Sequence, residues 1–424
     1  MKRKLIIGER IMYVDALTPV NCIFAVKIRG IIDPEILYAA LHKIQQKHPL
    51  LRMQIDDEQT GGPYFILNEN IKEIPVRITE RKNENDWLDE SKAEWNKLFD
   101  GENEPLARIV WLKSAETSDL LWVLPHCVCD GSTIVTLMQE MLYLLDQPDM
   151  QLVPYASFNS VQELLTPAFA VSQAKIFKAH MFSLLGKAFF YFKPTHRKIA
   201  AGNNYVLHWS LDQQQTAELV ERSKAAGTTV HATLCIAVMK AFQQVRGAKA
   251  HGKVICPVDI RQFIPEIKND TMFAFAPIVE LDIDKKTETD FWTMARTLKA
   301  DLNTKVKALK VEELLWISEY FHPVVSKMIK FLKATDGTHD VTLSNMGKLR
   351  ITETYQTFEV VAIHSPTVAF PWRNPNTLVA STFKNRMDFT FMSNDTFLTE
   401  QEAEQIKTGA MNLIFEDHKQ LSVA

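Results

Sequence analysis

Two patterns of hydrophobic and polar positions alternate along the chain. Residues 22–28 and 105–113 are short runs rich in apolar and β-branched residues, the pattern of buried strands. Around residues 34–48 and 132–145, apolar residues recur every three or four positions, which predicts helices. The order is strand, helix, several strands and a helix, and it begins again after residue 205. This order predicts an α+β fold with two lobes, each a mostly antiparallel sheet flanked by helices.

Residues 160–198 interrupt this order, because they are apolar and aromatic with Lys and His between the apolar positions. We therefore expect three parts: an N-terminal lobe at 1–160, a linker at 161–204 and a C-terminal lobe at 205–424. Within the linker, residues 175–193 carry apolar side chains around most of a predicted helix. Residues 315–333, in the predicted C-terminal lobe, form a similar apolar and basic helical stretch. Two interpretations of 175–193 stay open: packing between the lobes, or an interfacial surface that contacts a membrane or a long acyl chain.

The composition narrows the class of protein. The chain has 424 residues, of which 46% are hydrophobic and 23% charged, the balance of a folded globular protein. A formal net charge of -3 offers no electrostatic basis for binding nucleic acid. The five cysteines have no paired spacing, which predicts free thiols in a reducing compartment. The opening MKRKLIIGERIM lacks the apolar region of a signal peptide, and no run of about 18 apolar residues occurs, so we expect a cytoplasmic protein.

Residues 121–131, LWVLPHCVCDG, use polar residues in an unusual way, since they place His126 and Asp130 in a turn between a predicted strand and a predicted helix. The imidazole pKa is ordinarily about 6.5, so His126 can accept a proton at neutral pH. No Gly-x-Ser-x-Gly nucleophile motif occurs, and Cys127 would point to the face opposite its neighbour on extended backbone. We therefore predict that His126 deprotonates a substrate and does not activate an enzyme nucleophile.

Asp130 has a different predicted role. Pro125 and Gly131 interrupt any helix at this point, and a buried carboxylate without a partner is very costly. Asp130 is therefore expected to stabilise the turn by pairing with an arginine from elsewhere, for which there are three candidates: Arg261, Arg52 and Arg10. Gly131 is expected to adopt a backbone conformation that is unfavourable for other residues.

Two other interpretations of the motif stay open. His126 could be a core histidine whose ring is satisfied by its neighbours, followed by an Asp-Gly turn that caps the helix. His126, Cys127 and Cys129 could also bind a metal ion, but adjacent residues rarely chelate one zinc tetrahedrally and no Cys-x-x-Cys motif accompanies them. We therefore predict no metal site.

LPHCVCDG resembles the HxxxDG motif of the chloramphenicol acetyltransferase-like superfamily, which includes condensation domains of nonribosomal peptide synthetases and plant, carnitine and bacterial alcohol acyltransferases. Six further segments follow in the order that the family shows: KHPLLRMQI, PLARIVWL, STIVTLMQEMLYLL, GTTVHATLCIAVMKAF, CPVDIRQF and VTLSNMGKL. The similarity covers most of the chain at a low level. It is greatest to the stand-alone, condensation-domain-like alcohol or polyketide-associated acyltransferases, because the DFGWG motif of the plant branch is absent and SNMG stands in its region.

The resemblance implies a role for each matching residue of the turn. His126 corresponds to the general base of the family, and Asp130 and Gly131 to its structural aspartate and turn glycine. Arg261 corresponds to an arginine that pairs with this aspartate. Without the resemblance, Asp259 and Arg261 would be an ordinary surface pair.

The resemblance also implies a tunnel between the two lobes, with the donor entering one end and the acceptor the other. Ser344, Asn345 and Gly347 correspond to a segment that lines this tunnel opposite the histidine. The developing oxyanion needs a hydrogen-bond donor, for which Ser344 and Asn345 are candidates. A Ser-Asn pair at the end of a strand is also a common turn former.

The implied activity is that of an acyltransferase with no covalent enzyme intermediate and no tightly bound cofactor. It would move an acyl group from a thioester of coenzyme A or of a phosphopantetheine carrier protein to an alcohol or amine. The expected partners are a small-molecule or lipid-like acceptor and, for a carrier-bound donor, an acyl carrier protein; the chain is expected to be a monomer. The alternatives are a stand-alone condensation enzyme that joins carrier-bound substrates through an amide, and a non-catalytic relative that binds an acyl ligand or carrier protein. The complete motif favours a catalyst, because a non-catalytic copy has no chemical need for His126.

Overall fold

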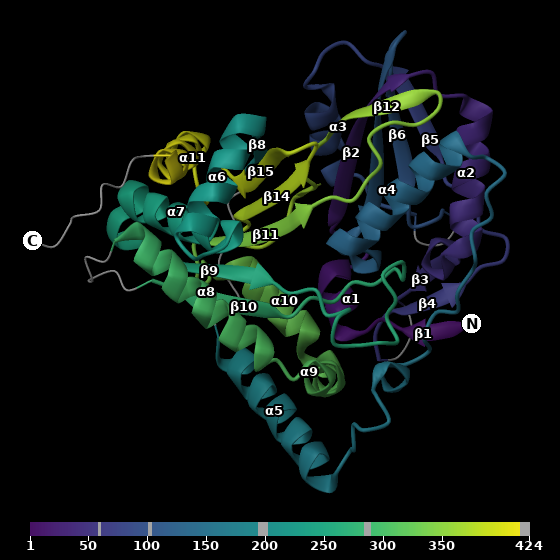
Figure 1. Cartoon of the computed structure of the whole chain (residues 1–424). Coiled ribbons are helices and arrows are strands. Elements are labelled where there is room, and N and C mark those ends of the chain that lie inside the picture. Colours follow the sequence, from purple (N-terminus) through teal and green to yellow (C-terminus); the bar gives the residue numbers. More distant parts are fainter. Residues whose placement is uncertain (58–60, 101–103, 194–201, 284–289, 416–424) are drawn as a thin grey trace, which may run out of the picture.

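The computed structural model describes five stretches of the chain: residues 1–57, 61–100, 104–193, 202–283 and 290–415. The helices and strands form two lobes, each with its own sheet and covering helices (Figure 1). This confirms the predicted α+β class with two lobes. The end of the predicted linker, 194–201, lies outside the described residues.

The sheet of the N-terminal lobe has the strand order β12-β2-β7-β6-β5, with β13 beside β2. Neighbouring strands are antiparallel except β5 and β6, which run parallel. The strands are β2 (Asn21–Gly30), β5 (Val76–Glu80), β6 (Arg108–Lys113), β7 (Thr117–Pro125), β12 (Phe358–Ile363) and β13 (Thr367–Val368). The C-terminal half of the chain therefore returns to complete the first sheet, and Figure 1 shows β12 in yellow-green among the purple and blue strands. The division at residues 160 and 204 stays a prediction.

The two faces of this sheet have different neighbours because side chains alternate along a strand. Phe24 and Val26 of β2 face one side, where they join the main core with α2 (Pro34–Lys47) and α4 (Gly131–Asp146). The alternate residues face α3 (Asp86–Trp95) and side chains of the C-terminal lobe. The second face of the sheet is thus part of the contact between the lobes.

The sheet of the C-terminal lobe has the order β10-β9-β11-β14-β15-β8. It is mixed, since β11 runs parallel to both β9 and β14 while the other pairs are antiparallel. Its strands are β8 (Asn204–Leu211), β9 (Lys253–Pro257), β10 (Ile278–Asp282), β11 (Val341–Lys348), β14 (Thr377–Phe383) and β15 (Arg386–Asn394). The helices of this lobe are α6 (Gln213–Ala225), α7 (Val230–Arg246), α8 (Phe291–Lys307) and α11 (Glu400–Phe415).

The remaining elements extend the two lobes. A small sheet of β1 (Lys2–Lys4), β4 (Tyr64–Leu67) and β3 (Met53–Asp56) lies in the first lobe, near α1 (Ile7–Tyr13). The predicted helical stretch at 315–333 is divided into α9 (Val311–Ser318), a 3-10 turn and α10 (Val325–Ala334). The division occurs at Pro323, because proline has no N–H to donate within a helix. Among the described residues, no single helix is long and apolar enough to cross a membrane.

Candidate active site

The turn that carries His126 is held at both ends. β7 ends at Pro125, a short 3-10 turn spans His126–Val128, and α4 begins at Gly131. The His126 backbone N–H donates to the Val20 carbonyl at 2.7 Å. Asp130 caps α4, because its Oδ1 accepts from the Thr133 N–H at 2.8 Å. The turn is therefore fixed by Val20 at its start and by the Asp130 cap at its end.

The backbone of the same turn orients the His126 ring. Its Nδ1 lies 2.9 Å from the Cys129 carbonyl oxygen, and a carbonyl can only accept a hydrogen bond. Nδ1 therefore carries the proton, and Nε2 keeps its lone pair for a proton from another group. Burial lowers the pKa of His126, because it disfavours the charged imidazolium; the contact with Cys129 and the charge of Asp130 oppose this shift more weakly. The ring is therefore neutral at neutral pH.

The carboxylate of Asp130 pairs with Arg261. Arg261 Nη1 lies 2.5 Å from Asp130 Oδ2, and Arg261 Nη2 lies 3.1 Å from Oδ1. With the cap to Thr133, both carboxylate oxygens of Asp130 are engaged. Of the three candidate arginines, the structure thus brings Arg261 to Asp130, whereas Arg10 donates to the His322 carbonyl at 3.0 Å. Asp130 is held as a fixed part of the turn and is not free to touch a substrate.

This ion pair joins the two lobes. Arg261 follows β9 of the second lobe, and its Nη2 also donates to the Thr271 carbonyl at 3.0 Å. A second contact runs beside it, since the Ser132 hydroxyl donates to Asp259 Oδ2 at 2.8 Å. The motif turn is therefore fixed from the opposite lobe at two positions, Asp130 and Ser132.

The expectation for the backbone of Gly131 was wrong. Gly131 is the first residue of α4 and does not have a positive φ, so its backbone is open to other residues. A Cβ at this position would lie 3.5 Å from Met346 Cε, an ordinary contact distance. Because Asp130 supplies the cap and already has extended backbone, the turn needs no left-handed residue.

The segment 344–347 lies at the end of β11, beside this turn. Met346 faces Gly131, as the contact distance above shows. The Gly347 N–H donates to Asn345 Oδ1 at 2.9 Å, and Gly347 has a φ of +67°, which favours glycine. Ser344 pairs with Val379 of β14. The structure thus brings this segment from the second lobe to the motif turn, while the roles of Ser344, Asn345 and Gly347 stay predictions.

Both cysteines of the motif are buried in the core of the first lobe. Burial raises the pKa of Cys127 well above its ordinary range, so the thiol is protonated at neutral pH and a poor nucleophile. His126 contacts Cys129 through the backbone carbonyl. The absence of a metal site at this turn stays a prediction.

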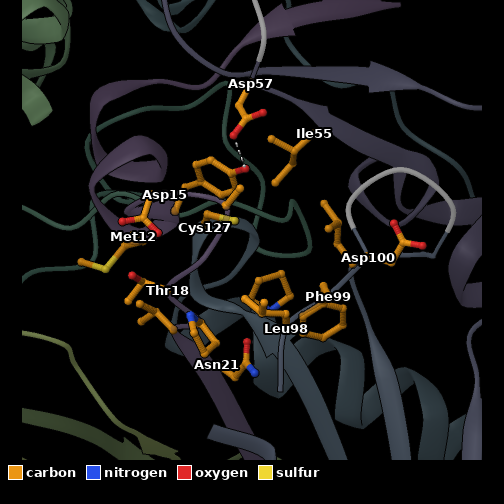
Figure 2. Close-up of a pocket in the computed structure, with 16 residues that line it drawn as sticks. Met12, Asp15, Thr18, Asn21, Ile55, Asp57, Leu98, Phe99, Asp100 and Cys127 are labelled. Carbon is orange, nitrogen blue, oxygen red and sulfur yellow. Dashed lines mark hydrogen bonds between the residues drawn. The ribbon is translucent and has the colours of Figure 1, made fainter. Parts of the chain in front are cut away.

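A recess of about 270 Å³ lies in the first lobe, on the Cys127 side of the turn (Figure 2). Its wall mixes apolar side chains such as Phe99 with polar ones, and the Tyr13 hydroxyl donates to Asp57 across it at 3.2 Å. Pro125 and Cys127 line the recess, but His126 does not. Sequence reasoning missed this recess, because its wall comes from several separate segments. A tunnel between the lobes stays a prediction.

Sequence reasoning also missed Phe370, whose ring centroid lies 5.6 Å from that of His126. Phe370 follows β13, in the part of the C-terminal half that crosses to the first lobe. Nothing in the local pattern around Phe370 marks it, since only the long-range pairing of β13 with β2 brings it to the motif.

Comparisons with known proteins agree with this architecture. Residues 203–398 match the family described as phthiocerol/phthiodiolone dimycocerosyl transferase C-terminus. Polyketide synthase associated protein 5 from Mycobacterium tuberculosis has a similar structure, with 16% identity over 97% of this chain and 98% of that chain and a TM-score of 0.66. A trichothecene 15-O-acetyltransferase from Fusarium sporotrichioides is similar with 13% identity over 97% of this chain and 94% of that chain and a TM-score of 0.74.

Curated sequences add a further relative. A linear gramicidin synthase protein from Brevibacillus parabrevis is 26% identical over 252 residues, which cover 54% of this chain and 5% of that protein. The chain thus spans only a small part of the length of the curated relatives that it matches. The fold is therefore the two-lobe chloramphenicol acetyltransferase-like fold that condensation domains share, and the chain is similar to the polyketide-associated acyltransferases.

Proposed function

We propose that this protein transfers an acyl group from a thioester, of coenzyme A or of a carrier protein, to an alcohol or amine, with His126 as general base. One observation carries the proposal. The Cys129 carbonyl holds the proton on Nδ1 of His126, so that Nε2 is available as a base, in a ring whose lowered pKa keeps it neutral. The described part of the turn offers no activated nucleophile, since the Cys127 thiol is buried and protonated.

The reaction would proceed in one direct transfer. Nε2 of His126 removes the proton of the acceptor hydroxyl or amine as that group attacks the thioester carbonyl carbon. The new carbon–oxygen or carbon–nitrogen bond forms, and the carbonyl oxygen becomes an oxyanion. When the oxyanion collapses, the carbon–sulfur bond breaks and the thiolate takes the proton back from His126. Substrates held on both sides of the ring would replace a covalent enzyme intermediate.

Asn345 is our candidate for stabilising the oxyanion. Its amide oxygen accepts from the Gly347 N–H, so the amide NH₂ is the end that remains to donate. Removing one donor of an oxyanion hole costs about 100-fold or more in rate. Asn345→Ala is therefore the variant that separates this role from that of a simple turn former.

The decisive experiment follows thiol release from a series of acyl-coenzyme A donors with pooled alcohols and amines. His126→Ala should lower the rate at least about 100-fold, the usual contribution of a general base. The matched control is His42→Ala, because His42 is an exposed histidine that pairs with Glu73 on the surface. Full activity of the His126→Ala protein, with its fold intact by circular dichroism, would defeat the assignment.

The runner-up is condensation of a carrier-bound acyl group with a carrier-bound amine, which the matches to peptide synthetases favour. The same assay with phosphopantetheine carrier proteins as donor and acceptor distinguishes the two reactions. Amide formed only between carriers would select condensation. A third outcome is that the wild type and His126→Ala bind an acyl ligand equally and neither turns over any pair of donor and acceptor. That result would identify a non-catalytic binding protein.

We further propose that α5 (Gln173–Phe192) rests on an anionic lipid surface, from which a lipid-like substrate would come. Its small residues face the protein: the Ser183 hydroxyl donates to the Tyr320 carbonyl at 2.7 Å, and Phe321 packs against Gly186. Its large apolar residues face solvent, including Phe177 (71% exposed) and Phe192 (81% exposed). This arrangement reverses the usual amphipathic pattern of a helix in water.

Lysines on α5 supply the charge that anionic lipids attract. Replacing three of them by glutamine should reduce flotation with vesicles of anionic lipid: Lys175, Lys178 and Lys187. The matched control replaces three lysines of the second lobe: Lys224, Lys249 and Lys307. Equal flotation of the α5 variant and the wild type would contradict the proposal without affecting the acyltransferase assignment.

A further inference from the structure

A second cluster of soft side chains lies in the C-terminal lobe, away from His126. His231 and Cys235 are one turn apart on α7, and Cys256 comes from β9, on which α7 packs. The Cys235 sulfur lies 4.0 Å from the Cys256 sulfur and 3.7 Å from Nε2 of His231. The sequence predicts no metal site here, because Cys235 and Cys256 are 21 residues apart and belong to no motif. The fold alone brings these three ligand atoms together.

The spacing of these atoms matches that of ligands around one zinc ion. With Zn–S bonds of about 2.3 Å, Zn–N bonds of about 2.0–2.1 Å and tetrahedral angles, two sulfurs lie about 3.8 Å apart and a sulfur and a nitrogen about 3.6 Å apart. The observed 4.0 Å and 3.7 Å are within about 0.2 Å of these separations. These two separations therefore need little change for the atoms to share a metal ion, and all three ligand atoms lie within 4.8 Å of one another.

His208, His364 and Asp388 also form a group of possible ligands. There, however, His208 Nε2 lies 2.6 Å from Asp388 Oδ2, which is a hydrogen bond and closer than two ligands of one metal ion stand. His208 and Asp388 are therefore already hydrogen-bonded to each other, whereas the sulfurs of Cys235 and Cys256 make only long, weak contacts.

The surroundings also suit a zinc ion. Two thiolates balance the charge of Zn²⁺ and a neutral imidazole adds none, so the buried centre would carry no net charge. Both cysteines are buried and His231 is partly exposed, which leaves a route from solvent on the histidine side.

We propose that His231, Cys235 and Cys256 bind one Zn²⁺ ion, with water as the fourth ligand. The ion would tie the first turn of α7 to β9, the strand after which Arg261 reaches across to Asp130. Its role is structural, because it supports the segment that anchors the His126 turn and takes no part in acyl transfer.

Metal binding is tested on the full chain, kept reduced with a phosphine and freed of metal by a chelator. Titration with Zn²⁺ against a chromophoric chelator should show one equivalent bound per chain. Co²⁺ in its place should give the thiolate-to-cobalt charge-transfer absorption and the visible bands of a tetrahedral centre. No binding of either ion would overturn the proposal.

Variants locate the site. Cys256→Ser and His231→Gln should each weaken Zn²⁺ binding by at least about tenfold, since even an outer-shell change has that effect. Cys22→Ser is the matched control, a buried cysteine of the other lobe that should bind Zn²⁺ as the wild type does. His231 is partly exposed, so His231→Gln decides the test if Cys256→Ser fails to fold. An unchanged affinity of His231→Gln for Zn²⁺ would refute the site. So would a wild-type protein that binds no Zn²⁺ but forms a Cys235–Cys256 disulfide with peroxide.

Discussion

At the scale of single residues, His126 is oriented by its own backbone. In hydrolytic triads a carboxylate holds the Nδ1 proton of the catalytic histidine. Here the Cys129 carbonyl has that position, and Asp130 is engaged with Arg261 and the start of α4. A carbonyl stabilises an imidazolium less than a carboxylate does, which suits a base that must return its proton in the same catalytic cycle.

With His126 as the proposed general base, its lowered pKa is expected to set the pH dependence of the reaction. The neutral ring is the active form, so kcat/KM should be high above the pKa of the folded protein and fall as the pH drops through it. Because burial lowers that pKa, the acid limb should lie below about 6.5, the ordinary value for histidine. The measurement is the pH profile of kcat/KM, taken from thiol release at donor concentrations below KM. An acid limb above the ordinary value would contradict the description of the site.

The residues of the site differ in how far the sequence could predict them. His126 stood out locally, because an ionisable side chain at the end of an apolar strand is unusual. The partner of Asp130 could be narrowed to Arg261 only through the family resemblance, since 131 residues separate the two. Phe370 and the recess could not be predicted, because long-range strand pairing and separate loops create them.

At the scale of elements, the periods of the sequence predicted most helices and strands of the two sheets. The division of the stretch near Pro323 was missed, although proline in a helical pattern is a recognised sign of a break. The parallel pairings of β11 were also beyond the local pattern, because strand direction depends on the route of the chain between strands. The start of α4 was predicted at its observed position, and its cap by the Asp-Gly turn was one of the interpretations left open, but the unusual backbone expected of Gly131 was wrong.

Replacing Gly131 by alanine tests whether the first position of α4 requires glycine. Gly131→Ala should leave the free energy of unfolding unchanged or raise it by about 0.5 kcal/mol, because helical alanine loses less entropy on folding than glycine. The added Cβ meets Met346 only at ordinary contact distance. Urea unfolding followed by circular dichroism measures the change. A loss above about 1 kcal/mol would show that the position requires glycine after all.

At the scale of the whole molecule, the lobes are joined around the motif turn by the Asp130–Arg261 pair and by Ser132 and Asp259. Arg261→Ala should lower the free energy of unfolding by about 3 kcal/mol, because it leaves a largely buried carboxylate unpaired. Adding Asp130→Asn should restore part of this loss, since no bare charge remains. Both values come from urea unfolding, and identical stability of the single variant and the wild type would refute the role of the pair.

The return of β12 to the first sheet has a consequence for biosynthesis. Glu359 of β12 pairs with Arg29 of β2, so the ribosome must add more than three hundred residues before this strand can reach its place. Until then, β2 presents an open edge, which is a template for pairing with other chains. A fragment cut after residue 204 would lack β12 and so keep this edge of β2 open, with Lys27 and Arg29 as the charged side chains along the strand that disfavour pairing with another chain.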